Sequence, residues 1–495
     1  MLSWLNPQID DGSKGSVNAI KEISPQGGGA ESSHESNETM KKTIQTLQEF
    51  SIPLILGVIC AMLWANLSPD SYSALVHTPV YLLGTIFNHA GGHGAVHAAG
   101  WDHYLTLHFL VNDIFMALFF GIAAKEITEA CLPNGALNPV SKAINPLFGT
   151  VGGVVGPIGV FLGLNAVFGT SVWANGWGVP TATDIALAWL VIKFLFGARH
   201  PAVSFLLLLA VADDAIGLGI IAIGYPDPNH PTQWMNLLWC LPGIGIAYGL
   251  RLNKVMNWVP YIAIGGAFCW WGLYSAHLHP ALALVFVVPF LPGPKHDLGL
   301  FVDDEDYSEG HHHSPLEQFE HSLKLFVDFG LFFFALVNAG VSFGEINGLS
   351  WIVVAALIVG KIVGITGFSA FAAKIGFPLP AGMNTGHLVV TSAVAGLGLT
   401  VALFVCGQAF VDPSLQAAAK MGAVFSVGAA GVAFALKKLL NVQDDVAVAS
   451  EGVETHPDLV AEGALEALSS AMEAVDEALA SGRLKELPAG SDSSH

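Results

Sequence analysis

Charged residues are scarce in this chain of 495 residues: Asp, Glu, Lys and Arg together make up only 12% of it. Soluble proteins carry about 25%, and a soluble domain with so little charge could not cover its surface. Hydrophobic residues reach 53%, and 55 glycines lie among them. The composition therefore excludes an ordinary soluble protein and predicts an all-α polytopic membrane protein.

Paired cysteines and basic clusters are also missing. The five cysteines are scattered without a CxxC pair, so neither a disulfide framework nor a zinc site is predicted. The first residues turn polar too soon for a cleavable signal peptide. The net charge of −20 comes mainly from three acidic stretches, 1–49, 297–320 and 442–495. No stretch resembles a nucleic-acid-binding surface, so we expect no nucleic-acid partner, no resident metal and no cofactor.

Twelve segments are apolar and long enough to cross a bilayer, which takes about 20 mainly apolar residues in a helix. The fourth is interrupted at its start by the Gly- and Pro-containing run 176–180, and the eleventh carries Gly396 and Gly398 in its middle. The predicted spans run roughly over 50–67, 105–126, 146–168, 177–195, 201–224, 235–251, 258–276, 279–292, 319–342, 350–373, 386–410 and 415–437.

Lysine and arginine set the expected orientation. With the N-terminus inside, none of the outward segments contains a Lys or Arg. Of the 19 basic residues, Lys361 lies mid-span, Lys420 lies near the outer face, and the other 17 lie on or close to the inside. Because positive charge is retained on the cytoplasmic side, we predict a multi-pass protein of the cell inner (plasma) membrane with both termini in the cytoplasm.

The chain divides into three predicted regions. Residues 1–45 are rich in Gly, Ser and Glu and are expected to form a disordered cytoplasmic segment. Residues 46–440 form the transmembrane domain. Residues 441–495 form an acidic cytoplasmic tail, in which apolar residues spaced by three and four predict a short amphipathic helix over 457–480.

Asp213 and Asp214 are adjacent carboxylates about half-way through the otherwise apolar fifth span. An ionisable residue at the centre of a membrane helix costs about 2.5–3.5 kcal/mol. The two side chains point about 100° apart, so one can face a cavity while the other meets a neighbouring helix. Buried neighbouring carboxylates repel each other, which favours binding of a proton. The pair predicts a site where Na+ and H+ compete, with a purely structural pair as the alternative.

Lys361 is the only basic residue deep in a span, and an unpaired ammonium there would be neutralised or expelled. Its natural partner is Asp213 or Asp214. Asp184 and Thr183 follow the interruption of the fourth span, where a carboxylate would offset positive half-helix ends and a hydroxyl would bond freed backbone groups. An ordinary N-cap is the alternative for Asp184.

Glu126 lies near the inner end of the second span. There it would line a cytoplasmic funnel that draws cations, or else it is a solvated helix end. Histidines are dense at 89–108 and at 311–313. Loop histidines at irregular spacing are mostly solvated, and pH sensing or adventitious metal binding are the alternatives.

Taken in order, these motifs resemble the NhaA-type sodium/proton antiporters over roughly residues 45–440. Carrying the resemblance are the Asp213-Asp214 pair, Gly360-Lys361, and the runs 64–69, 111–113, 176–186, 338–341 and 396–400. The second span departs from the family pattern: it lacks the funnel carboxylate before Lys125, and Glu126 is offset from that place.

The resemblance implies twelve spans in two inverted repeats, with the fourth and eleventh helices discontinuous and crossed at the midplane. It implies electrogenic exchange of two protons for one Na+ or Li+, serving sodium and pH homeostasis, rather than an enzymatic activity. Asp213 and Asp214 would bind the ion and exchange protons, Lys361 would pair with Asp213, and Thr183 and Asp184 would support the crossed helices. It further implies a homodimer through the outer segment 68–104, in contact with membrane lipid.

Two other functions stay open. One is a sodium-coupled transporter of another small solute on the same scaffold, against which the lack of further polar residues in the spans argues. The other is a non-transporting sensor that acts through the C-terminal tail.

Overall fold

The computed structural model describes residues 51–82, 104–132, 135, 137, 140–226, 231–293 and 314–442. Within these ranges the chain is helical, with no strand and one β-bridge between Pro79 and Thr106. The chain divides into units 1–444 and 445–495, and the described residues all belong to the first. The predicted disordered segment 1–45, nearly all of the tail 441–495, most of the outer segment 68–104 and the histidines at 311–313 lie outside the described residues.

The helices follow one another along the chain with short connections. The first half forms α2 (Ile52–Leu67), α3 (Pro69–His77), η1 (Val80–Leu82), α5 (Leu107–Phe109), η3 (Leu110–Phe115), α6 (Met116–Cys131), α7 (Val140–Phe168), η4 (Trp173–Thr181), α8 (Ile185–Phe196) and α9 (Pro201–Gly224). The middle forms η5 (Trp234–Trp239), α10 (Cys240–Leu252), η6 (Tyr261–Gly266), α11 (Ala267–Ser275), η7 (Pro280–Phe286) and η8 (Val288–Phe290). The last part forms α12 (Pro315–Asn338), η10 (Phe343–Glu345), α13 (Gly348–Ala355), η11 (Ala356–Gly360), α14 (Lys361–Lys374), α15 (Thr385–Val394), α16 (Leu399–Ala409), α17 (Pro413–Phe425) and α18 (Gly428–Leu439).

Helical residues occupy each of the predicted spans. Among the described residues, five helices are long and apolar enough to cross a membrane: Leu107–Cys131, Ala143–Phe168, Pro201–Gly224, Gly348–Lys374 and Pro413–Leu439. The number rises to seven if two bent pairs each count as one span, η4 with α8 (52°) and α15 with α16 (51°). The run 176–180, predicted to interrupt the fourth span, itself forms part of the 3-10 helix η4, and the bend follows at 182–184.

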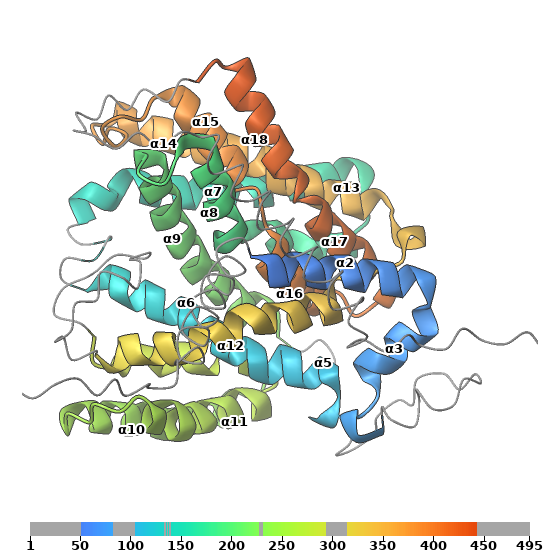
Figure 1. Cartoon of the computed structure of the whole chain (residues 1–495), viewed down its shortest axis with the longest axis vertical. Coiled ribbons are helices and arrows are strands. Elements are labelled where there is room, and N and C mark those ends of the chain that lie inside the picture. The colour runs from blue at the N-terminus through green and yellow to red at the C-terminus, as the bar shows by residue number, and fades with distance from the viewer. Residues whose placement is uncertain are drawn as a thin grey trace, which may run out of the picture. The chain divides into compact units, whose positions relative to one another are not determined.

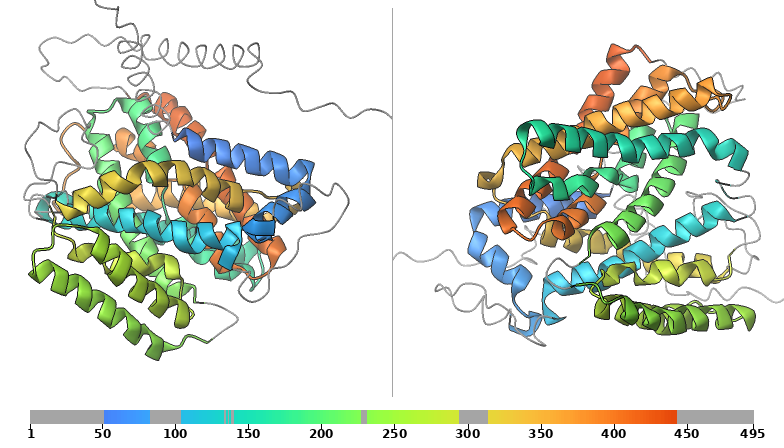
Figure 2. Two further views of the ribbon diagram at one scale, coloured as in Figure 1. Left: turned by 60° about the horizontal axis from the view of Figure 1, so that its bottom comes forward. Right: turned by 180° about the vertical axis from the view of Figure 1, so that it is seen from behind.

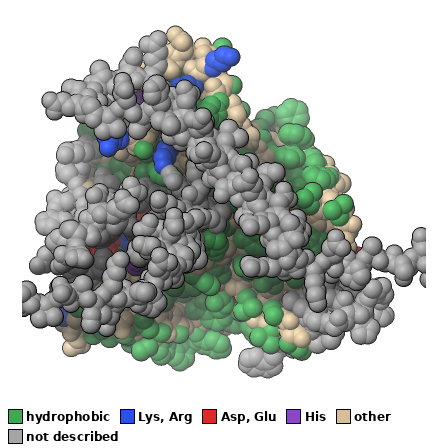
Figure 3. All heavy atoms as spheres, viewed as in Figure 1, with side chains coloured by type: hydrophobic (Ala, Val, Ile, Leu, Met, Phe, Trp, Pro, Cys, Tyr) green, Lys and Arg blue, Asp and Glu red, His purple; other side chains and the backbone are tan. Residues whose placement is uncertain are grey.

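Side-chain exposure separates a buried interior from an apolar surface. Large apolar side chains such as Leu63, Trp271 and Phe333 are about half exposed on α2, α11 and α12. Figure 3 shows apolar side chains over the lower and right parts of the visible surface, with Lys and Arg gathered at the upper left. An apolar outer surface of this kind is what hydrocarbon requires of the helices that face it.

The interior is arranged around α9. In Figure 1, α9 lies between α7 and α6, and both helices contact it. His200 caps its start by accepting the Ala202 N–H at Nδ1 (3.1 Å), and Pro201 occupies the first turn, where a missing N–H costs nothing. The helix then runs unbroken for 24 residues. Asp213 and Asp214 are thereby carried to its middle, deep inside the bundle.

Candidate functional site

Lys361 binds three oxygen acceptors at the centre of the bundle. Its Nζ donates to Asp213 Oδ2 (2.5 Å), to the Thr181 carbonyl (2.5 Å) and to Thr183 Oγ1 (3.1 Å). The side chains of Lys361 and Asp213 are both 0% exposed. An ammonium has three N–H donors, so each has an acceptor. The structure thus brings together the buried lysine and the first carboxylate of the pair.

Lys361 is held in this place by unusually close helix packing. Its neighbours Gly360 and Gly364 lie against α7, where a Cβ on Gly364 would come 2.0 Å from the Gly152 carbonyl and one on Gly360 2.5 Å from Pro157 Cα. Small residues let membrane helices approach to backbone contact. Figure 2 shows α7 and α14 running side by side, seen from behind. The Gly-Lys-x-x-Gly sequence therefore places the lysine by removing side chains on either side of it.

Asp213 and Asp214 have different surroundings, because they leave α9 in different directions. Asp213 is 1% exposed and faces Lys361 and Thr183, whose Oγ1 lies 2.8 Å from its Oδ2. Asp214 is partly exposed and lines a small pocket with four apolar residues of α6, α9 and α16: Phe120, Ala123, Leu218 and Val401. One carboxylate is anchored and the other faces an opening.

Each carboxylate keeps one buried oxygen without a hydrogen-bond partner. These are Oδ1 of Asp213 and Oδ1 of Asp214. Buried polar atoms are nearly always bonded, so exceptions call for an explanation such as a missing ion or water. Unbonded carboxylate oxygens on adjacent residues are the hard ligands that a small cation takes, and they are also the atoms that bind a proton.

The two bends are bonded to each other beside this pair. The Asp184 N–H donates to the Leu397 carbonyl (2.6 Å), and Thr183 Oγ1 lies 3.0 Å from the Ala395 carbonyl. The Asp184 carboxylate caps two helices, accepting the Leu187 N–H at the start of α8 and the Thr400 N–H at the start of α16, each at 3.1 Å. The N-cap reading of Asp184 is therefore correct for α8, and the second cap joins the bends.

The charges around the bends match the helix ends. The N-termini of α8 and α16 carry partial positive charge, which the Asp184 carboxylate offsets. The free carbonyl of Thr181 ends η4, where the partial charge is negative, and Lys361 binds it. Thr183, Asp184, Asp213 and Lys361 thus form one hydrogen-bonded group around two exposed backbone ends.

A second charged group lies on α6 and α12. Lys125 Nζ is 2.7 Å from Glu129 Oε2 and also pairs with Glu320 of α12. Glu126, the predicted funnel residue, adjoins this group and interacts electrostatically with Asp214. Glu129 and Glu320 were not singled out from the sequence. The spacing of four between Lys125 and Glu129 is a helical ion-pair signal, whereas nothing local marks Glu320.

Comparison with known proteins identifies the family. A family model described as "Na+/H+ antiporter 1" matches residues 41–436. A protein named Na(+)/H(+) antiporter NhaA from Desulfitobacterium hafniense (strain DSM 10664 / DCB-2) is 55% identical over 406 residues, covering 82% of this chain and 98% of the relative. A protein of the same name from Geobacter metallireducens is 53% identical over 404 residues, covering 82% and 99%. One from Jannaschia sp. is 43% identical over 422 residues, covering 80% and 97%. The chain is therefore a multi-pass membrane protein that belongs to the Na+/H+ antiporter 1 family.

Proposed function

We propose that sodium/proton antiport by this chain takes place at Asp213 and Asp214. Asp214 is the principal ion-binding carboxylate, and Asp213 is its companion, paired with Lys361. The observation that carries the proposal is the pair of buried Oδ1 atoms without a partner, on adjacent carboxylates beside a lysine whose three donors are all used. A cation or a proton satisfies these oxygens, but not both at once.

The exchange follows from competition at one site that opens alternately to either side. Protonated carboxylates face outward, turn inward and release their protons, and Na+ or Li+ then binds the freed oxygens. Lys361 pairs with Asp213 in one state and is displaced or deprotonated when the ion binds. Two protons entering for one cation leaving carry one net positive charge inward, so the exchange is electrogenic and a proton gradient drives sodium export.

The architecture around this site is proposed to be twelve spans in two inverted repeats, with the bent pairs η4–α8 and α15–α16 crossing at the midplane. Support comes from the hydrogen bonds that join the two bends. Both termini are cytoplasmic, in the cell inner membrane. This orientation is supported by basic residues in the last turns of four helices, α8, α10, α14 and α18: Lys193, Arg251, Lys374 and Lys437.

Two further assignments belong to the same proposal. Glu126 lines the cytoplasmic approach to the site, supported by its electrostatic interaction with Asp214. The segment 68–104 forms a homodimer contact in the presence of membrane lipid. Its described part contains α3, with the exposed Asp70 in the first turn.

The test uses purified full-length protein in liposomes with an imposed proton gradient. Adding Na+ or Li+, but not K+, should change the internal pH, and the rate should respond to a clamped membrane potential. Asp214→Asn should abolish exchange while the protein stays folded. Asp70→Asn makes the same chemical change at an exposed position and should leave the rate unchanged. Normal exchange by Asp214→Asn would refute the site, and no response of the native protein to any cation would favour transport of another solute.

A further inference from the structure

Tyr225 binds two backbone groups of η4 with one hydroxyl. It follows the last residue of α9 and is 4% exposed. Its Oη accepts the Gly178 N–H (2.7 Å) and donates to the Asn175 carbonyl (2.9 Å). A 3-10 segment at a helix break leaves backbone groups without helical partners, and this phenol satisfies two of them. The end of α9 is thereby fastened to η4.

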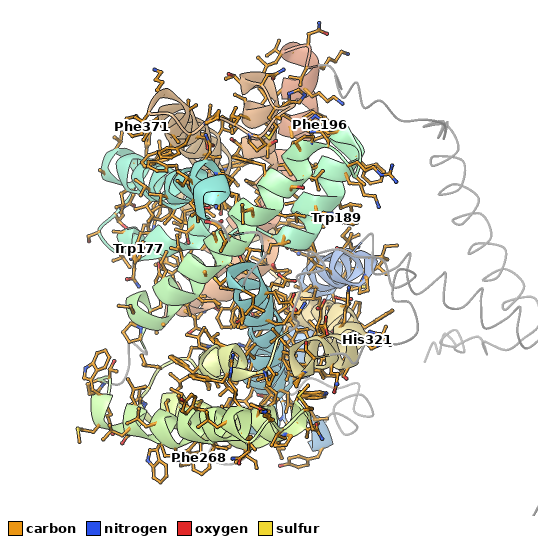
Figure 4. The ribbon with its side chains drawn as sticks, turned by 90° about the vertical axis from the view of Figure 1, so that its left-hand side faces the viewer. Trp177, Trp189, Phe196, Phe268, His321 and Phe371 are labelled. Carbon is orange, nitrogen blue, oxygen red and sulfur yellow. The ribbon has the colours of Figure 1, made fainter. Side chains whose placement is uncertain are left out.

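The same part of η4 is fastened to α16. The Asn175 side chain donates to the Ala409 carbonyl, at the last residue of α16. The indole of Trp177, labelled in Figure 4, stacks on the Tyr225 ring with centroids 5.8 Å apart and an angle of 22°. A Cβ on Gly178 would lie 2.7 Å from Tyr225 Oη. Three elements are thus clasped together through Tyr225 and Asn175, which we call the Tyr225 clasp.

Aromatic side chains close the space beside the clasp. Gly176 lies between the rings of Phe410 and Phe161, which would stand 2.7 and 3.0 Å from a Cβ placed on it. Phe161 is 0% and Phe410 4% exposed. No room remains for water or a cation between η4 and these rings. At this end the molecule is sealed.

The clasp and the charged site are connected through η4. The Thr181 carbonyl at one end of this short helix binds Lys361, while Asn175 and Gly178 bind Tyr225. Along α9, Tyr225 lies about 18 Å beyond Asp213, at about 1.5 Å per residue. The opposite end of α9 adjoins the basic helix ends, where Lys437 binds the Leu195 carbonyl. The clasp therefore lies on the side away from the proposed cytoplasmic face.

We propose that Tyr225 is a positioning residue of the exchange cycle, a latch that seals the outer side while the site faces the cytoplasm. Its two hydrogen bonds break when η4 moves away from α9 and α16 and the site turns outward. The proposal rests on the function proposed above. It assigns Tyr225 no contact with the ion. Its effect reaches the site through η4 and Lys361.

Cys406 provides a native reporter for this movement. It is 0% exposed on α16 and interacts electrostatically with the Tyr225 phenol. The other four cysteines are replaced by alanine, and a membrane-impermeant maleimide is added from outside to intact cells. Tyr225→Phe keeps the ring and its stacking on Trp177 but loses both hydrogen bonds. The labelling rate of Cys406 should rise about tenfold, as expected for two hydrogen bonds of ordinary net strength.

Two controls separate the latch from a general loosening of the fold. Tyr248→Phe makes the same change on α10 at a side chain that is 51% exposed, and Cys406 labelling should not change. A second reporter keeps only Cys240, which is buried on α10 away from the clasp, and its labelling should be the same with and without Tyr225→Phe. The apparent KM for Na+ at the cytoplasmic side should rise in Tyr225→Phe, because the inward-facing state is less populated.

The proposal is overturned if Cys406 labelling does not change, if Cys240 labelling rises equally, or if Cys406 reacts only from the cytoplasmic side. If Tyr225→Phe does not reach the membrane, Asn175→Ala loosens the same clasp by one hydrogen bond and should raise labelling about threefold. Labelling requires no transport, so these outcomes are independent of the Asp214→Asn result. An inactive native protein with an intact labelling response would refute the proposed function and leave the latch standing.

Discussion

Replacing Lys361 by alanine should destabilise the protein by about 3–5 kcal/mol, the usual loss when one partner of a buried ion pair is removed. The structure supports a value in this range, because three acceptors lose a donor together. They are the Thr181 carbonyl, Thr183 Oγ1 and Asp213 Oδ2, and no solvent reaches the lysine, which is 0% exposed. Asp213 would remain buried, with Thr183 as its remaining hydrogen-bond partner.

Thermal unfolding of the purified protein, followed by tryptophan fluorescence, measures this loss, and the 12 tryptophans give an ample signal. The Tm of Lys361→Ala should fall by on the order of 5–10 °C. Lys374→Ala removes an exposed lysine from the end of the same helix and should change the Tm little. The double variant Lys361→Met with Asp213→Asn removes both charges and should recover much of the loss, because no unpaired charge remains buried.

The pH dependence of the loss has a definite sign. At acid pH Asp213 in Lys361→Ala can take up a proton and become neutral, so the loss should shrink; at alkaline pH it must stay charged, and the loss should be largest. A Lys361→Ala protein as stable as the native one at pH 9 would refute the reasoning. So would a double variant that is no more stable than Lys361→Ala alone.

Three further predictions concern the scaffold around the site. Asp184→Ala removes the caps of α8 and α16 and should cost about 1–2 kcal/mol per cap by the same thermal assay, with Asp184→Asn retaining part of it; equal Tm values for the two variants would contradict the double cap. Gly364→Val should abolish the yield of folded protein, judged by size-exclusion profile, because a Cβ there meets the Gly152 carbonyl at 2.0 Å. By contrast Gly367→Val, where nothing lies within 4 Å, should be tolerated. His200→Ala should lower stability by about 1 kcal/mol through loss of the α9 cap, whereas His200→Asn should not, and a Tm that fell equally in both would point to another role for this histidine.

The contact between Lys361 and a carboxylate of the pair could be predicted from the sequence, because a charge deep in a membrane span must find an opposite charge. The different surroundings of Asp213 and Asp214 followed from the angle between adjacent helical residues. Both arguments need only the residue types and their depth, which a single sequence supplies.

The backbone partners could not be predicted in the same way. The Thr181 carbonyl, the Gly178 N–H and the Asn175 carbonyl are groups that every residue carries, so the residue type does not indicate which of them is left exposed by a bend. The bend itself was expected within 176–180 because Gly and Pro favour interruption. It follows that run instead, since a 3-10 helix accommodates Pro180 and the extended conformation begins at Ala182.

The ion pair between Lys125 and Glu320 illustrates a second limit. The two residues are 195 positions apart and belong to helices whose contact depends on the whole bundle. A single sequence gives no information on such a pair, and the offset position of Glu126 drew attention to a neighbour of the lysine rather than to its distant partner.

The packing of α14 on α7 has a mechanical consequence. Where two helices touch through backbone atoms, as at Gly152 and Gly364, no side chain can change rotamer to absorb a small displacement. The two helices therefore tilt as one stiff beam. Lys361 begins α14 within this contact, so a tilt moves its ammonium by a fixed amount relative to Asp213 on α9. Even a rotation of a few degrees would be transmitted to the ion pair in full, without slack.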